Sequence, residues 1–277
     1  MDNRVKSEVC TCDLDGNVAV IYRHEGHIEA PNWHPDGYLI VNGGGLLFRL
    51  EQGADALVQI DTGFAVSCNN DHGISPDGKM LVISDATMTD RSCIYTLAIG
   101  GGAPVRVTEA TPSWWHGWSP DGARLAYAAA RPAGAPIGLY TCALDGSDEV
   151  CVTLDFDHVD GPDYSADGKW IWFNGERDGR VELWRIRPDG TDLEQMTDDA
   201  AVNWFPHPSP DGQHVVYLAY PEGTQGHPGG LHVSLRTMSA DGGSTRHLAD
   251  LYGGQGTINV RSWSPDSRQF AFVRYED

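Results

Sequence analysis

A six-fold repeat of one short motif constrains the fold of this 277-residue chain more than any other feature. The motif is an aromatic or apolar residue followed by Ser-Pro-Asp-Gly or a close variant, and its aspartates are Asp36, Asp77, Asp121, Asp167, Asp211 and Asp266. Consecutive aspartates lie 41, 44, 46, 44 and 55 residues apart. A period of this length is typical of a four-stranded propeller blade. Because Ser, Pro, Asp and Gly all favour tight turns, the motif predicts the same turn in each blade.

The two ends of the chain complete one another in this repeat. Residues 8–22 have the pattern of a third and fourth strand without the first two, and residues 259–275 that of a first and second strand without the last two. Joining them in one blade removes the exposed sheet edges of an open array. We therefore predict an all-β fold with a single domain over residues 1–277. It is a six-bladed β-propeller of four-stranded blades, closed by its N-terminal and C-terminal strands.

Charge and hydropathy exclude several classes of partner. The 39 acidic residues outnumber the 19 Lys and Arg, which gives a formal net charge of −20. Such a surface repels nucleic acid and anionic membranes, so we expect neither as a partner. No apolar run is long enough to span a bilayer. The first residues lack the apolar segment of a secretory signal, which predicts a cytoplasmic location.

The segments that enter the innermost strands hold the candidate site. His72 and His116 each lie five residues before a turn aspartate and His207 lies four before one, while Asp160 comes from the blade between those of His116 and His207. Ring geometry brings such positions toward the central channel. Imidazole and carboxylate groups together predict a divalent metal site, with an ion such as Mn, Zn or Ca held by His72, His116, His207 and Asp160. The alternative is that these histidines pack in the channel and hydrogen-bond the backbone.

A long loop over residues 220–231 is expected to cover the same face and to bring His227 to it. Arginines in the corresponding loops of other blades suggest an acidic small-molecule or sugar ligand, although local surface ion pairs explain them as well. We expect His116 and His227 to transfer protons. The expected ligand contacts are Asp71, Asp163, Trp115, Gln255, Asn259, Arg261, Glu222, Arg131 and Arg177.

The six turn motifs, with this closure of the ring, resemble the TolB-type propeller repeat family across essentially the whole chain. The segment Phe205-Pro-His207-Pro-Ser209 is similar to the histidine–proline segment of metal-dependent oligogalacturonate lyases, which are also propellers, although the paired second histidine is absent here. The second resemblance implies metal-assisted acid–base or elimination chemistry on a carbohydrate-like acid. The first implies an alternative, a scaffold that holds a protein partner. A third hypothesis, independent of either resemblance, is a metabolite-binding module without turnover.

Overall fold

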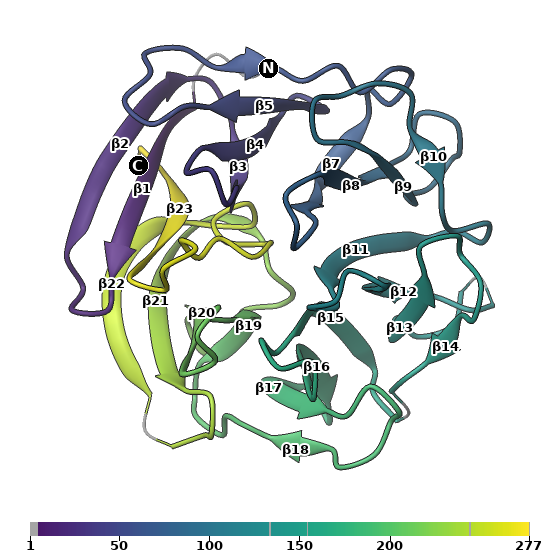
Figure 1. Cartoon of the computed structure of the whole chain (residues 1–277). Coiled ribbons are helices and arrows are strands. Elements are labelled where there is room, and N and C mark those ends of the chain that lie inside the picture. Colours follow the sequence, from purple (N-terminus) through teal and green to yellow (C-terminus); the bar gives the residue numbers. More distant parts are fainter. Residues whose placement is uncertain (1–4, 133, 154, 244, 277) are drawn as a thin grey trace.

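The computed structural model describes residues 5–132, 134–153, 155–243 and 245–276, and the predicted domain ends, residues 1 and 277, lie outside these ranges. Six antiparallel sheets surround a central axis, like blades of a propeller (Figure 1). Every regular element in the described ranges is a β-strand. The predicted all-β, six-bladed fold is confirmed.

Five blades have four strands each, and their first strands lie nearest the axis (Figure 1). One blade contains β3 (Glu29–Trp33), β4 (Leu39–Gly43), β5 (Leu46–Leu50) and β6 (Val58–Gln59). The next contains β7 (Cys68–Ile74), β8 (Met80–Asp85), β9 (Cys93–Ala98) and β10 (Val105–Arg106). The third contains β11 (Ser113–Trp118), β12 (Arg124–Ala129), β13 (Gly138–Ala143) and β14 (Val150–Cys151). The fourth contains β15 (His158–Tyr164), β16 (Ile171–Arg177), β17 (Arg180–Ile186) and β18 (Glu194–Gln195). The fifth contains β19 (Val202–Pro208), β20 (His214–Tyr220), β21 (Gly229–Ser239) and β22 (Arg246–Gly254).

The sixth blade closes the ring with strands from both ends of the chain. It contains β23 (Gln269–Tyr275), β1 (Lys6–Asp13) and β2 (Val18–Glu25), and β1 pairs with β23 from Ser7–Tyr275 to Asp13–Gln269. The innermost place is taken by an irregular segment that forms an isolated bridge, Trp263 to Phe270. This segment follows a glycine-rich stretch, residues 253–256, whose backbone freedom disfavours a regular strand.

The repeated turns explain why the motif recurs. In five of them the serine hydroxyl donates to the turn aspartate over 2.6–2.8 Å, and in all six the backbone N–H of the fourth residue donates to the carbonyl of the first. That fourth residue has positive φ, which glycine adopts without steric cost, and in the last turn Ser267 takes it at φ 60°. His34 replaces serine in the first turn, and its Nε2 donates to the carbonyl of Gly78 in the next blade.

Each of the five regular inner strands has a shift of register near its middle. The shifts lie between Glu29 and Asn32, Cys68 and His72, Trp115 and Gly117, Asp160 and Asp163, and Trp204 and His207. Such bulges bend a strand and re-aim its side chains, and they are frequent next to active sites. The core fills the space between blades, where Trp115, Trp172 and Trp204 are among the largest fully buried side chains.

Candidate functional site

A cavity of about 450 Å³ lies where the inner strands begin, at one mouth of the channel; we call it the first cavity. Five of its lining residues occupy the same position in their blades, seven residues before the turn aspartate. They are Glu29, Asn70, Trp114, Asp160 and Asn259. Side chains from five blades therefore meet at one level of the channel. Most carry carboxylate or amide groups, which suits a polar ligand.

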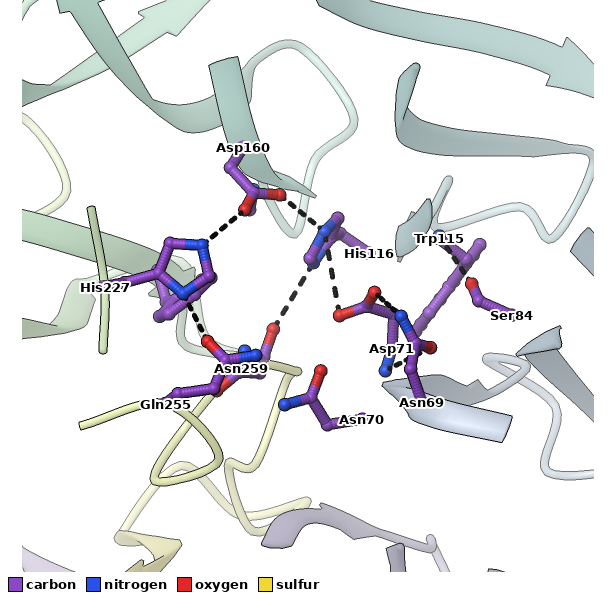
Figure 2. A network of polar contacts seen from close by, with 12 residues as sticks. Asn69, Asn70, Asp71, Ser84, Trp115, His116, Asp160, His227, Gln255 and Asn259 are labelled. Carbon is purple, nitrogen blue, oxygen red and sulfur yellow. Dashed lines mark hydrogen bonds and ion pairs between the residues drawn. The ribbon is translucent and has the colours of Figure 1, made fainter. Parts of the chain in front are cut away.

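Asp160 lies between two histidines in the wall of this cavity (Figure 2). Its Oδ1 is 2.8 Å from His116 Nε2, and its Oδ2 is 3.4 Å from His227 Nε2. The other ring nitrogen of His227 contacts Gln255 Oε1, and that of His116 lies 3.4 Å from the carbonyl oxygen of Asn259. One carboxylate thus orients both imidazoles, each of which is also held from its opposite side.

A second carboxylate, Asp71, faces His116 from the neighbouring blade (Figure 2). Asp71 Oδ1 lies 3.9 Å from His116 Nε2, and Asp71 Oδ2 accepts a hydrogen bond from Asn69 Nδ2. Farther along the wall, Asn70 Nδ2 donates to Glu29 Oε2 over 3.1 Å. Burial raises the pKa of Glu29, against the opposing effects of His27 and of this hydrogen bond.

The four titratable groups at the centre perturb each other strongly. Burial opposes a charge on His116, but Asp71 and Asp160 outweigh it and raise the pKa of His116 to about 9. Burial also opposes a charge on His227, but Asp160 outweighs it and raises the pKa of His227. In turn, the two imidazoles outweigh burial at Asp160 and hold its pKa well below its usual value. Burial raises the pKa of Asp71 to about 6, even beside His116. At neutral pH, His116 is therefore cationic beside an ionised Asp160, the raised pKa of His227 favours its charged form, and Asp71 titrates just below neutrality.

Asp163, predicted to contact the ligand with Asp160, forms a separate cluster instead. Its Oδ2 lies 3.2 Å from His207 Nδ1, and Arg261 Nη2 lies 3.1 Å from its Oδ1. The second nitrogen of His207 donates to the carbonyl of Ile258 over 2.6 Å. Asp160 and Asp163 lie on either side of the bulge in β15, so they face different ends of the channel.

Several of the residues predicted to contact the ligand do not line the first cavity. Trp115, Asp163 and Arg261 line a different cavity at the opposite mouth. Glu222 lines a surface hollow beside Arg180 and Asp198. The inner strands run through the channel from one mouth to the other, so an offset of a few residues decides which mouth a side chain reaches.

The two loop arginines predicted to contact the ligand, Arg131 and Arg177, do not line the first cavity either. Arg131 pairs with Glu149 at 3.2 Å and donates to Ser113 Oγ at 2.7 Å, while Arg177 lies over the ring of Phe156 and donates to the carbonyl of Asp155. Both guanidinium groups are held by partners from their own blade or from the loop entering it. The local ion pairs considered as the alternative for these loops explain Arg131.

The four predicted metal ligands do not converge. His116 and Asp160 are in contact, but His207 is bonded through both nitrogens to other groups. His72 is fully buried beside the backbone of Ile40, and burial lowers its pKa to about 4. Across residues 5–276, excluding the gaps at 133, 154 and 244, no group of three or more His, Cys, Asp or Glu side chains is arranged to hold a metal ion. A divalent ion stays a prediction from the sequence that this donor arrangement does not support.

Sequence reasoning placed Asp71, His116, Asp160, His227, Gln255 and Asn259 in one site, and the structure brings these six residues together. It missed Glu29, Asn70 and Trp114, as well as His158 and Asn69. A usable signal was present for three of them. Glu29, Asn70 and Trp114 share the offset of Asp160 and Asn259 from the turn aspartate, whereas only the histidines had been compared across blades.

Fold and site together define a six-bladed propeller with a polar cavity at one mouth of its channel. Residues 113–277 match the PD40 family, the TolB β-propeller domain. The chain is also 47% identical over 258 residues to an uncharacterized protein of Agrobacterium fabrum (strain C58), an alignment that covers 92% of this chain and 87% of that one. The chain belongs to the TolB β-propeller family.

Solved structures agree with this assignment. A structure from Agrobacterium tumefaciens, assigned provisionally as TolB, has a TM-score of 0.95 and 44% identity, with 99% of each chain covered. An oligogalacturonate lyase in complex with manganese has a TM-score of 0.55 and 14% identity, with 81% of this chain and 66% of that one covered. This second likeness shows a shared fold alone. His207, through which the sequence resembles such lyases, belongs to the Asp163 cluster and not to the first cavity.

In the described part of the chain, no helix is long and apolar enough to cross a membrane.

Proposed function

We propose that the first cavity binds a small carbohydrate-like acid and that Asp71, His116, Asp160 and His227 can move a proton on it. One observation carries the proposal: two imidazoles share the Asp160 carboxylate at a cavity of about 450 Å³. His227 is about a quarter exposed, so its ring is accessible to a ligand while its position is fixed. Asp71 and Asp160 balance the charge of the imidazoles, so an anionic ligand group would be recognised by the exposed ring of His227, whose raised pKa favours its charged form.

The rest of the lining suits the remainder of such a ligand. The amides of Asn69, Asn70, Gln255 and Asn259 line the cavity and can both donate to and accept from hydroxyl groups. The indole of Trp114 supplies an apolar face against which a sugar ring can pack. A carboxylate would lie near His227, and the hydroxyl groups would face the amides.

Proton transfer needs groups whose pKa values lie near the working pH. Asp71, with a pKa of about 6, is largely ionised at neutral pH and can accept a proton, while His227, with its raised pKa, can donate one. Asp160 fixes the orientation of both imidazoles and stabilises their charge. This division of roles places the base and the acid on different blades, on two sides of a bound ligand.

The test is calorimetric titration with D-galacturonate and, as its uncharged counterpart, D-galactose. We expect D-galacturonate to bind with 1:1 stoichiometry and D-galactose to bind at least about tenfold more weakly, since a charge-assisted hydrogen bond contributes roughly 1.5–3 kcal/mol. His227→Gln should weaken D-galacturonate binding by a similar factor. His247→Gln is the matched control, because His247 pairs with Asp250 on the exposed outer strand β22.

Equal binding of the two sugars, or binding unchanged by His227→Gln, would contradict the proposal. Turnover is tested separately by NMR of a galacturonate disaccharide incubated with the protein. Elimination takes a proton from the carbon next to the carboxylate and breaks the glycosidic C–O bond. The products are an unsaturated uronide and the departing sugar, whose oxygen takes up a proton and becomes a free hydroxyl group. Binding without this product would identify a metabolite-binding module.

A further inference from the structure

The opposite mouth of the channel has a cavity of its own, of about 390 Å³, which we call the second cavity. It is surrounded by the repeated turns, and five of the six turns contribute a proline to its lining: Pro35, Pro76, Pro120, Pro210 and Pro265. Four indole side chains lie beside this proline ring: Trp33, Trp115, Trp118 and Trp263. The walls of the second cavity therefore combine proline and indole faces with polar side chains such as Asn32 and Asp163, whereas amide and carboxylate side chains predominate in the first cavity.

The wall is held in place before any ligand arrives. Each turn is closed by its own hydrogen bonds, and neighbouring turns also contact each other: His34 Nε2 donates to the carbonyl of Gly78, and the backbone N–H of Asp211 donates to Ser267 Oγ. The indole N–H of Trp263 donates to the carbonyl of His207 over 2.8 Å. A preformed apolar cavity binds at a lower entropic cost than one that must be ordered.

One guanidinium group supplies the polar recognition. Arg261 is one-third exposed, and its Nε and Nη2 are held by Asp163 and by the carbonyl of Tyr164. Its Nη1 makes no hydrogen bond within the described ranges and remains available. His116 also lines this cavity, but Asp160 and Asp71 compensate its charge from the first cavity, as Asp163 compensates that of Arg261. Recognition of an anionic ligand group therefore depends on the available Nη1 of Arg261.

We propose that the second cavity is a binding site for a small aromatic carboxylate, whose ring packs between the tryptophan and proline side chains and whose carboxylate accepts a hydrogen bond from Arg261 Nη1. Aromatic rings pack favourably against indole and proline faces in a water-poor cavity. A guanidinium already fixed by a buried carboxylate loses little freedom when it binds a second anion. The proposal is independent of the function proposed for the first cavity.

The experiment uses phenylacetate, with phenylacetamide as the uncharged analogue of equal shape. Binding is measured by calorimetry and by the ¹⁵N NMR signals of the Arg261 guanidinium and of the indole N–H groups. We expect 1:1 binding of phenylacetate, a shift of the Arg261 signal, and binding of the amide at least about tenfold weaker. Arg261→Lys, which keeps a cation for Asp163 but removes the guanidinium fork, should weaken phenylacetate binding by at least a similar factor.

Two control variants distinguish binding in the second cavity from binding elsewhere on the protein. Arg268→Gln removes an exposed arginine of the same mouth and should leave binding unchanged. His227→Gln alters only the first cavity and should also leave it unchanged. The proposal is overturned if phenylacetate does not bind at millimolar concentration, if the acid and the amide bind equally, or if His227→Gln abolishes binding while Arg261→Lys does not.

Discussion

The two mouths of the channel use the same strand in different ways. In both, a carboxylate from β15 lies between two basic side chains: Asp160 between His116 and His227, and Asp163 between His207 and Arg261. The first is surrounded by amides and by a second carboxylate, Asp71, and the second by tryptophan and proline. A single bulge between Asp160 and Asp163 is enough to send two nearby residues to opposite ends.

This difference matters because the basic partners differ in chemistry. Both partners of Asp160 are histidines, which can be charged or neutral, whereas one of the two partners of Asp163 is an arginine that stays charged at any working pH. The first mouth is therefore suited to proton transfer, and the second to fixed binding of an anion. Three comparisons between the mouths test this contrast.

The largest expected effect comes from removing each carboxylate in turn. Asp160→Asn and Asp163→Asn should each lower the free energy of unfolding by about 3–5 kcal/mol at pH 7, because they leave His116 and Arg261, respectively, without a carboxylate partner. The penalty of Asp160→Asn should begin to shrink by pH 9, where His116, with a pKa of about 9, has lost about half of its charge in the wild type. The penalty of Asp163→Asn should persist. Chemical denaturation at the two pH values measures both, and equal pH dependence of the two penalties would refute the contrast.

A smaller effect concerns the wild-type protein between pH 6.5 and 9. The pKa of His116 is raised on folding from its ordinary value of 6.5 to about 9, so its contribution to stability is complete below pH 6.5 and is lost as pH rises through 9. The loss is expected to be on the order of 3 kcal/mol. His116→Gln should flatten this slope, whereas Arg261→Lys at the other mouth should leave it unchanged. If the pH dependence of stability persists in His116→Gln, other groups must cause it.

The smallest effect compares two glycines with similar positive φ, one near each mouth. Gly256 (φ 91°) lies beside the first cavity, where an added Cβ would lie 2.4 Å from Glu29 Oε2 and 2.7 Å from Tyr275 Oη. Gly37 (φ 95°) lies in a turn, where an added Cβ would meet no described atom within 4 Å. Gly37→Ala should cost about 1–2 kcal/mol for its conformation alone. Gly256→Ala should cost about 1–3 kcal/mol more because of overpacking, as thermal unfolding would reveal. Equal costs would mean that the first cavity accommodates an added Cβ as easily as an open turn does.

The number and order of the blades could be predicted because they depend on local chemistry that repeats. Each Ser-Pro-Asp-Gly turn is stabilised by hydrogen bonds among its own residues, such as that between Ser119 and Asp121. The motif therefore predicts the turn wherever it occurs. The closure of the ring followed from counting strands at the two ends. The irregular inner segment before Trp263 was not foreseen, although its glycines indicate it.

The candidate site was only partly predictable from counting positions. Asp160 and Asn259 were recognised, but Glu29 and Trp114 at the same offset were not, because neither belongs to the histidine pattern on which the prediction was built. His72 and His116 have equal offsets and yet only His116 reaches the channel cluster. An equal offset predicts an equal height in the ring, but it does not predict the direction of a side chain on a bulged strand.

The amino-acid pattern specifies the architecture: six turns, their period, the pairing of the two chain ends and the strand on which most candidate residues lie. Which candidates meet depends on the folded ring. Blade formation depends on contacts within some forty residues, and these are encoded locally and repeated. The sharing of Asp160 by His116 and His227, and of Asp163 by His207 and Arg261, depends on where each inner strand bulges and on how adjacent blades pack, which arises only when the whole ring is closed.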